Sequence, residues 1–125
     1  MRILLDTHVA LWWANDPDML AGNARAMIAD GRNDVFLSSA SVWEAAIKTA
    51  AGRLETPTSI EEAALEGGLR ELAISWKHAR RAAALPPFHK DPFDRMLVAQ
   101  ALEEELVLIT RDPLVQQYAV PIVAG

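Results

Sequence analysis

The chain has 125 residues, 51% of them hydrophobic and 23% charged, a balance typical of one globular domain with a buried core and not of a disordered chain. The formal charge of −5 argues against a protein that coats nucleic acid through a generally basic surface, but it leaves room for a nucleic-acid enzyme whose acids are neutralised by metal ions. Because the sequence has no cysteine, no apolar run of about 18 residues and no signal-peptide pattern, disulfides and thiolate metal sites are excluded and a cytoplasmic protein without a membrane segment is expected.

Short apolar runs rich in β-branched residues alternate with helical patterns along the whole chain. The expected strands cover residues 2–5, 35–37, 70–74, 106–109 and 120–123. The expected helices cover residues 7–14, 16–30, 38–51, 59–67, 75–84 and 113–118, with one more that opens at residue 91. Strands separated by helices pair in parallel through right-handed crossovers. We therefore predict a single α/β domain over residues 1–125, with a mostly parallel sheet of four to five strands flanked by helices.

The most informative stretch runs from residue 89 to residue 112 and reads as a helix followed by a buried strand. Asp91 is expected to cap the helix, Pro92 to occupy its first position and Asp94 to lie in its first turn. Apolar residues follow Asp94 at spacings of three, four and seven, so Asp94 heads the face of the helix that points to the core. The strand at 106–109 then ends at Asp112. An acid thus lies at the start of the helix and another at the end of the strand.

Four carboxylates are expected to meet at one edge of the sheet. Asp6 ends the first strand, Glu44 is expected in the first turn of the helix after the second strand, and Asp94 and Asp112 flank the fourth strand and its helix. In a parallel α/β sheet the carboxyl ends of strands and the amino ends of helices share an edge. Crowded carboxylates raise one another's pKa unless a cation lies between them. Hard oxygen ligands suit Mg²⁺ or Mn²⁺.

Each acid also has a purely structural explanation. Glu44 follows Ser41 at the spacing of a capping box, and Asp94 could complement the helix dipole. Asp112 before Pro113 and Asp6 before its helix are both suitable N-caps. The joint case for a site is stronger than any single one, because Asp6 and Asp112 directly follow the two runs that read as the most buried strands.

Four motifs in order resemble one protein family. They are LLDTH at 4–8, SSASVWEAAIK at 38–48, HKDPFDRMLVAQA at 89–101 and LITRD at 108–112. Together they are similar to the PIN-domain ribonucleases, in particular the VapC-type toxins of bacterial toxin–antitoxin pairs. The similarity spans essentially the whole chain, and the motif at 89–101 is the specific one.

The resemblance implies a function and a set of residues. The family's acidic cluster falls on Asp6, Glu44, Asp94 and Asp112, all of which would be catalytic and metal-binding, and none is missing. It implies a three-layer PIN-like domain and an Mg²⁺- or Mn²⁺-dependent endoribonuclease that leaves 5′-phosphate and 3′-hydroxyl ends. It also implies an RNA substrate, a VapB-like antitoxin and a homodimer. Thr7 and Thr110 match the family's hydroxyl positions beside the acids.

Several cationic and aromatic residues near the acids are weaker candidates. Arg95 and Arg111 are possible phosphate contacts or could orient the carboxylates beside them, and Lys48 could contact RNA or form an i,i+4 pair with Glu44. For His8 and His89 structural or surface roles are favoured, because neither has a partner at metal-ligand spacing. The basic run of Lys77, His78, Arg80 and Arg81 is expected to be a solvated face, which is favoured over a surface that RNA approaches. One of the adjacent Trp12 and Trp13 is expected to line a partner surface.

Other classes of small α/β protein fit the sequence less well. A response-regulator receiver needs a phosphoacceptor aspartate after its third strand, where this chain has Ser75. A phosphatase with Asp6 as nucleophile needs a second acid two residues on, where this chain has His8. A non-catalytic regulatory or partner-binding domain with a structural acidic pocket stays open as the alternative.

Overall fold

A five-stranded parallel sheet forms the middle layer of the computed structural model, which describes residues 1–125. The strands are β1 (Arg2–Leu5), β2 (Asp34–Ser38), β3 (Arg70–Leu72), β4 (Val107–Thr110) and β5 (Ile122–Ala124). Their spatial order is β3-β2-β1-β4-β5, and every neighbouring pair is parallel. The predicted α/β class and the single parallel sheet are therefore confirmed.

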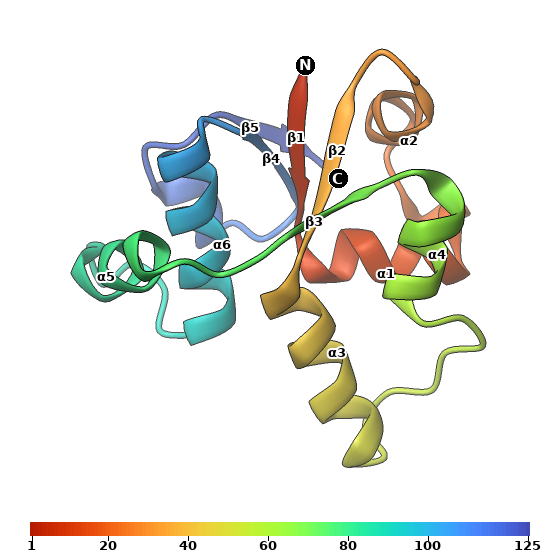
Figure 1. The fold of residues 1–125 in the computed structure, drawn as a ribbon, viewed down its shortest axis with the longest axis horizontal. Helices are drawn as coiled ribbons and strands as arrows, with labels where there is room; N and C mark the ends of the chain where they lie inside the picture. The colour runs from red at the N-terminus through yellow and green to blue at the C-terminus, as the bar shows by residue number, and fades with distance from the viewer.

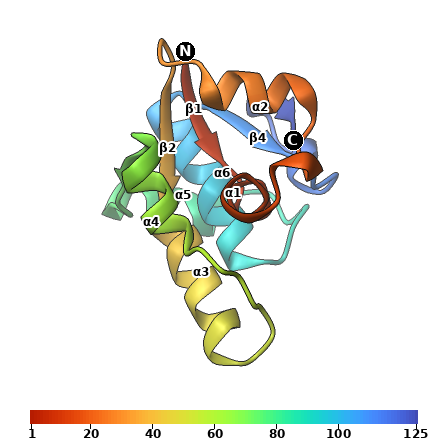
Figure 2. The ribbon, with the colours of Figure 1, turned by 90° about the vertical axis from the view of Figure 1, so that its right-hand side faces the viewer.

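Helices cover both faces of this sheet, as Figure 1 shows. The α-helices are α1 (Thr7–Asn15), α2 (Gly22–Ala29), α3 (Ser39–Ala50), α4 (Ile60–Gly67), α5 (Trp76–Ala84) and α6 (Pro92–Glu104). Two short 3₁₀ helices are η1 (Pro17–Met19) and η2 (Val115–Gln117). In Figure 1, α5 and α6 lie on one side of the sheet and α1, α2 and α4 on the other. Figure 2 shows α3 extending away from the sheet below the carboxyl ends of the strands. None of these helices has the length and the apolar character needed to span a bilayer.

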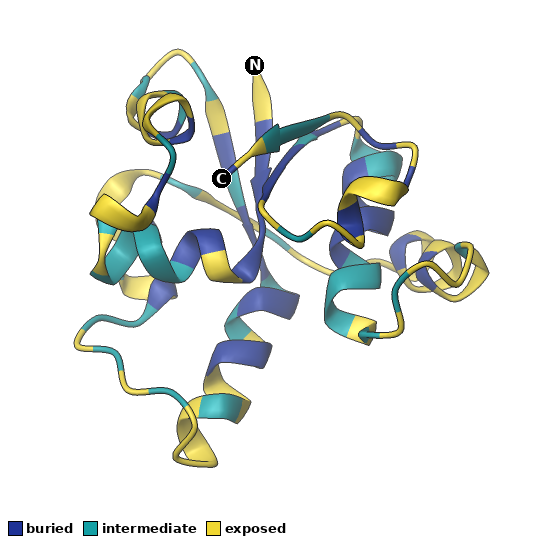
Figure 3. Cartoon of the chain, turned by 180° about the vertical axis from the view of Figure 1, so that it is seen from behind, coloured by how far each residue is buried: buried dark blue, intermediate teal, exposed yellow.

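The side chains of the central strand, β1, alternate between two separate hydrophobic cores. Ile3 and Leu5 pack into the larger core with α1, α2 and α4, whereas Leu4 packs into a second core with α6. Neighbouring β4 divides its residues in the same way, with Ile109 in the first core and Leu108 in the second. A strand buried on both faces needs apolar residues at successive positions. This explains the unbroken apolar runs of β1 and β4, and Figure 3 shows β1 in dark blue beyond its exposed first residue.

The helix expected over residues 16–30 is the main error in the predicted elements. The structure divides it into η1 and α2, with Leu20 and Ala21 in extended conformation between them. Leu20 is buried in the larger core, and the amide of Ala21 donates a 3.1 Å hydrogen bond to the carbonyl of Gly125. The chain breaks the helix here because docking against the carboxyl terminus satisfies the backbone and buries the leucine.

The sheet order places a topological switch point between β1 and β4. The chain builds outward from β1 through β2 to β3, and then returns to the opposite side of β1 to form β4 and β5. Ligands of open α/β sheets bind beyond the carboxyl ends of the strands at such a point. Asp6 follows β1 and Asp112 follows β4, so two of the predicted acids lie at this crevice.

Candidate metal-binding active site

Asp6 is a buried carboxylate held from two sides. It caps α1 by accepting a 2.8 Å hydrogen bond at Oδ1 from the amide of His8, and its Oδ2 accepts one of 2.8 Å from the hydroxyl of Thr110. Only 4% of the residue is exposed. Burial raises its pKa above the ordinary value, although the bonds from Thr110 and His8 act in the opposite direction. Capping and membership of the acidic cluster are thus combined in one side chain.

Asp94 lies in the first turn of α6, as predicted. The helix begins because Asp91 accepts hydrogen bonds from the amides of Phe93 and Asp94, with Pro92 at the first helical position. Burial and then the negative charges of Asp6 and Asp91 raise the pKa of Asp94 to about 7. A carboxyl group with such a pKa is ready to exchange its proton for a cation near neutral pH.

Asp112 follows β4 and is joined to Asp94 through His89. The Nε2 atom of His89 lies 2.9 Å from Asp112 Oδ2 and 3.0 Å from Asp94 Oδ2. The Nδ1 atom accepts a 3.1 Å hydrogen bond from the amide of Asp91, which leaves the ring proton on Nε2, facing the two acids. Burial opposes ionisation of Asp112, but hydrogen bonds from His89 and Leu114 outweigh it and hold the pKa below its ordinary value.

The expectation that His89 has no partner at metal-ligand spacing was wrong. One ligand atom from each of His89, Asp94 and Asp112 lies within 4.8 Å of the others. No local sequence signal could have found this contact, because Asp112 lies 23 positions further along the chain. His8 differs: its side chain is largely exposed, and its Nδ1 lies 3.9 Å from Asp6 Oδ1.

Glu44 reaches the cluster from the second turn of α3, not from the first turn as expected. The helix is capped by Ser38, whose hydroxyl accepts from the amide of Ala40, so the capping box expected between Ser41 and Glu44 is absent. Glu44 is 4% exposed, and its Oε2 accepts a 2.8 Å hydrogen bond from Lys48 one turn further on. Its Oε1 is buried and has no hydrogen-bond partner.

Charge effects connect the four predicted acids in pairs, whereas the group at mutual ligand distance contains Asp94, Asp112 and His89. The charges of Asp6 and Glu44 both raise the pKa of Asp94, and the charge of Asp112 raises that of Asp6. Such mutual effects require short separations, because screening removes the interaction between distant charges. A recess of about 220 Å³ opens beside this cluster, lined by Asp6, His8, Val9, Trp12, Arg111 and Asp112.

The predicted neighbours of the acids divide into those that contact a carboxylate and those that do not. Thr110 and Lys48 bind Asp6 and Glu44 directly. The hydroxyl of Thr7 instead donates a 2.9 Å hydrogen bond to Ser41, which ties α1 to α3. The guanidinium groups of Arg95 and Arg111 bind backbone carbonyls and form no ion pair with an acid.

The expectation that Trp12 or Trp13 lines a partner surface is not supported by their positions. Both are half-buried and pack against the larger core. The ring of Trp12 is covered by the guanidinium of Arg111, 4.3 Å from its centroid. Trp13 packs closely on Gly67, where an added Cβ would come within 2.8 Å of its ring. The well-exposed tryptophans are Trp43 and Trp76.

Comparison with known proteins identifies the class. The model of the PIN domain family matches residues 3–121. The ribonuclease VapC22 of Mycobacterium tuberculosis is 30% identical over 122 residues, covering 95% of this chain and 93% of that protein. The chain therefore belongs to the PIN domain family, and within it to the group of VapC ribonucleases.

Solved structures show the same fold. VapBC2 of Rickettsia felis, crystallised with a DNA fragment from its promoter, superposes with a TM-score of 0.73 at 15% identity and covers 99% of this chain and 98% of its own. FitAcB of Neisseria gonorrhoeae superposes with a TM-score of 0.61 at 19% identity, covering 96% and 95%. At this level of identity the likeness concerns the fold.

Proposed function

We propose that this chain is an Mg²⁺- or Mn²⁺-dependent endoribonuclease that acts as the toxin of a toxin–antitoxin pair. The observation that supports a bound metal ion is the Oε1 atom of Glu44, a buried carboxylate oxygen without a hydrogen-bond donor. Leaving such an oxygen unpaired costs about 1–3 kcal/mol or more. A cation bound at this position removes that cost and the repulsion among the four acids.

The donor set fits a hard divalent cation. Asp6, Glu44, Asp94 and Asp112 offer carboxylate oxygens only, with no thiolate in the chain. Such ligands favour Mg²⁺ or Mn²⁺ over softer metals. Asp6 and Asp94 are proposed as the principal ligands, and Glu44 and Asp112 as ligands directly or through water. When bound, the cation would neutralise negative charge on a phosphodiester and lower the pKa of water beside it.

The protein's own groups serve to position these ligands. Thr110 and the amide of His8 fix both oxygens of Asp6, and the start of α6 fixes Asp94. His89 holds Asp112 and Asp94 together through a single nitrogen. Lys48 neutralises one oxygen of Glu44 and leaves the other free. Carboxylates held in this way need little reorganisation when a cation and a phosphate arrive.

The proposal is tested by RNA cleavage under control of the metal. The wild-type protein should cleave a structured RNA in Mg²⁺ or Mn²⁺ and lose the activity in EDTA. Asp6→Asn and Asp94→Asn should abolish cleavage while the protein stays folded, and both should weaken Mn²⁺ binding, measured by the shift of the unfolding temperature. Asp18→Asn is the matched control, because Asp18 is an exposed acid paired only with Arg25. Full activity in both active-site variants would refute the assignment.

The proposed toxin role implies a protein partner and an oligomeric state for this chain. Two of the similar structures, VapBC2 and FitAB, are both named as bound to a DNA fragment. By analogy we propose a VapB-like antitoxin for this chain, and a homodimer. Expression of the chain should arrest growth, and the Asp94→Asn variant should not. Co-expression of a VapB-like antitoxin should relieve the arrest; relief without formation of a stable complex would contradict the antitoxin assignment.

A further inference from the structure

An aromatic pair, formed by the exposed Trp43 and the half-buried Phe93, lies next to two of the acids in the sequence. The ring of Trp43 lies 5.2 Å from that of Phe93, at an interplanar angle of 73°. Trp43 directly precedes Glu44 on α3, and Phe93 directly precedes Asp94 on α6. The two rings therefore bridge the helices that carry two of the four acids. Since consecutive Cα atoms are about 3.8 Å apart, the backbone of each aromatic residue lies directly beside that of an acid.

Packing does not account for the exposure of Trp43. Its side chain is 62% exposed, although α3 buries Ala40, Glu44 and Ala45 on its inner face. Phe93 makes an edge contact with the indole and leaves most of the indole surface free. A large rigid aromatic surface held open to solvent next to a reactive centre is suited to stacking on a planar ligand.

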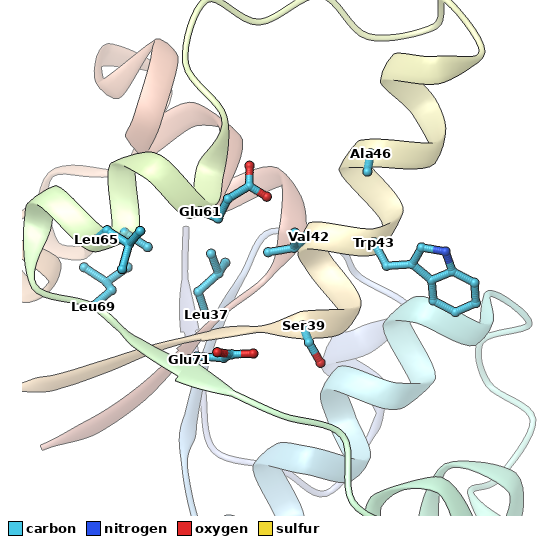
Figure 4. A pocket seen from close by; sticks show the side chains of 10 residues that line it. Leu37, Ser39, Val42, Trp43, Ala46, Glu61, Leu65, Leu69 and Glu71 are labelled. Carbon is cyan, nitrogen blue, oxygen red and sulfur yellow. The ribbon is translucent and has the colours of Figure 1, made fainter.

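Trp43 is also one of the residues that line a nearby apolar groove. The groove has a volume of about 360 Å³ and lies between α3, α4 and β3, with Val42, Leu65 and Leu69 in its wall. Figure 4 shows that the indole of Trp43 extends away from Leu65 and Leu69, toward α6. Trp43 stands at the edge of this groove, and its indole extends toward the helix that carries Asp94.

Charge alone gives the site little attraction for RNA. The chain has a net charge of −5, and its crowded acids repel a phosphate backbone. Three of the nearby cations already have partners: Lys48 binds Glu44, whereas Arg95 and Arg111 bind backbone carbonyls. An uncharged aromatic surface attracts a nucleobase without adding to this repulsion. Stacking is also the usual way in which proteins hold unpaired bases.

We propose that Trp43, supported by Phe93, is a stacking platform for one unpaired nucleobase of the RNA beside the cleaved phosphodiester. This rests on the proposed ribonuclease function and adds a substrate contact to it. Because every base has a π-face, the contact selects for single-stranded RNA and does not select base identity. Trp43 is accordingly a positioning residue, and Phe93 limits the orientations that its ring can adopt.

The test combines substitutions with abasic RNA. The substrate is a single-stranded oligonucleotide that the wild-type protein cleaves, prepared with one abasic nucleotide at each position in turn. Trp43→Ala should raise KM by roughly 5- to 30-fold and change kcat little, and Trp43→Phe should have a smaller effect. Trp76→Ala is the matched control, because Trp76 is 92% exposed on α5. One abasic position should reproduce the defect, and on that substrate Trp43→Ala should add nothing.

Two results would overturn the stacking role. One is an equal loss on intact RNA and on every abasic substrate. The other is a change of oligomeric state with KM unchanged, which would assign Trp43 to an interface between protein molecules.

If the chain is not a ribonuclease, the outcome differs from a failure of the stacking role alone. If the wild-type protein cleaves no RNA in Mg²⁺ or Mn²⁺, the ribonuclease assignment fails, and a fluorescently labelled single-stranded RNA oligonucleotide is used to measure binding. Weaker binding by Trp43→Ala than by Trp76→Ala then supports stacking, and equal binding rejects it.

Discussion

The hydroxyl of Thr110 donates a 2.8 Å hydrogen bond to Oδ2 of Asp6, across 104 positions of sequence. The bond joins the end of β4 to the residue that follows β1, at the switch point of the sheet. The same hydroxyl accepts a 3.1 Å bond from the amide of Asp112. One threonine thus fixes two members of the acidic cluster, and its hydrogen-bond pattern requires a hydroxyl and not merely a β-branched shape.

Substitutions of Thr110 distinguish the role of its hydroxyl group from the role of its β-branched shape. Thr110→Val keeps the shape but leaves Oδ2 of the buried Asp6 without a donor, so we expect it to lower the free energy of unfolding at pH 8 by about 1–3 kcal/mol. It should also weaken Mn²⁺ binding, because the pKa of Asp6 rises further. Thr110→Ser restores the donor and should recover most of both losses. Chemical denaturation and Mn²⁺ titration measure them; equal behaviour of the two variants would show that the hydroxyl is dispensable.

We predict that the positive charge of Lys48 replaces part of the charge of the metal ion proposed at Glu44. Lys48→Met leaves the Glu44 carboxylate, which is 4% exposed, without its donor. In EDTA the variant should be less stable than wild type by roughly 1–3 kcal/mol. Saturating Mn²⁺ should raise its unfolding temperature more than that of wild type, because the ion takes over the lost neutralisation. Lys77→Met is the control at an exposed lysine without an ion pair; an equal response to Mn²⁺ in all three proteins would argue against Glu44 as a ligand.

Asp94 should make the metal-free protein less stable as the pH rises. Its folded-state pKa of about 7 lies above the ordinary 3.8, so between these values the folded protein retains a proton that the unfolded chain has lost. Stability therefore falls from about pH 4 to pH 7 and then levels off. Asp94→Asn removes this penalty, and in EDTA its advantage over wild type should be larger at pH 8 than at pH 5. The depressed pKa of Asp112 acts below the ordinary value and does not overlap this window.

Calorimetry over pH 5–8 measures whether the stability of the metal-free protein falls relative to Asp94→Asn as the pH rises. A constant difference between wild type and Asp94→Asn across the range would show that Asp94 is not the titrating group. The same proton competes with a cation, so Mn²⁺ affinity of the wild-type protein should increase with pH up to about 7 and then change little.

The parts of the site that are locally encoded could be predicted from the sequence. Apolar runs placed Asp6 and Asp112 at strand ends, and the cap formed by Asp91 and Pro92 placed Asp94 in the first turn of α6. Glu44 was assigned to the wrong turn because three serines, at 38, 39 and 41, can each cap a helix. Which one does so depends on where β2 ends.

Residues whose partners come from distant elements could not be assigned in this way. His89 meets Asp112 across 23 positions, and no local pattern reports that distance. Arg111 stands next to an acid in the sequence, yet its guanidinium turns to the carbonyl of Gly125 and to the ring of Trp12. Proximity in sequence therefore misled the assignment of the arginines, since long flexible side chains follow the nearest unsatisfied acceptors.

Arg95 provides the clearest test of such a structural arginine. Its guanidinium donates to the carbonyls of Ala82 at 2.7 Å, Leu85 at 2.9 Å and Pro86 at 3.0 Å, and it also reaches the carbonyl of His89 at 3.2 Å. It thereby holds the segment that leads from α5 to α6 and carries His89 to the acids. We expect Arg95→Met to lower the free energy of unfolding by roughly 2–4 kcal/mol.

Lysine should not rescue this position, because a single ammonium cannot reproduce the planar fork of donors. Both Arg95→Met and Arg95→Lys should reduce RNA cleavage through displacement of His89, while the salt dependence of RNA binding stays that of wild type. A lost phosphate contact would instead reduce the dependence of binding on salt by about one ion. Arg80→Met, at an exposed arginine on α5, is the matched control. If Arg95→Lys keeps wild-type stability and activity, the carbonyl contacts are not what makes arginine necessary here.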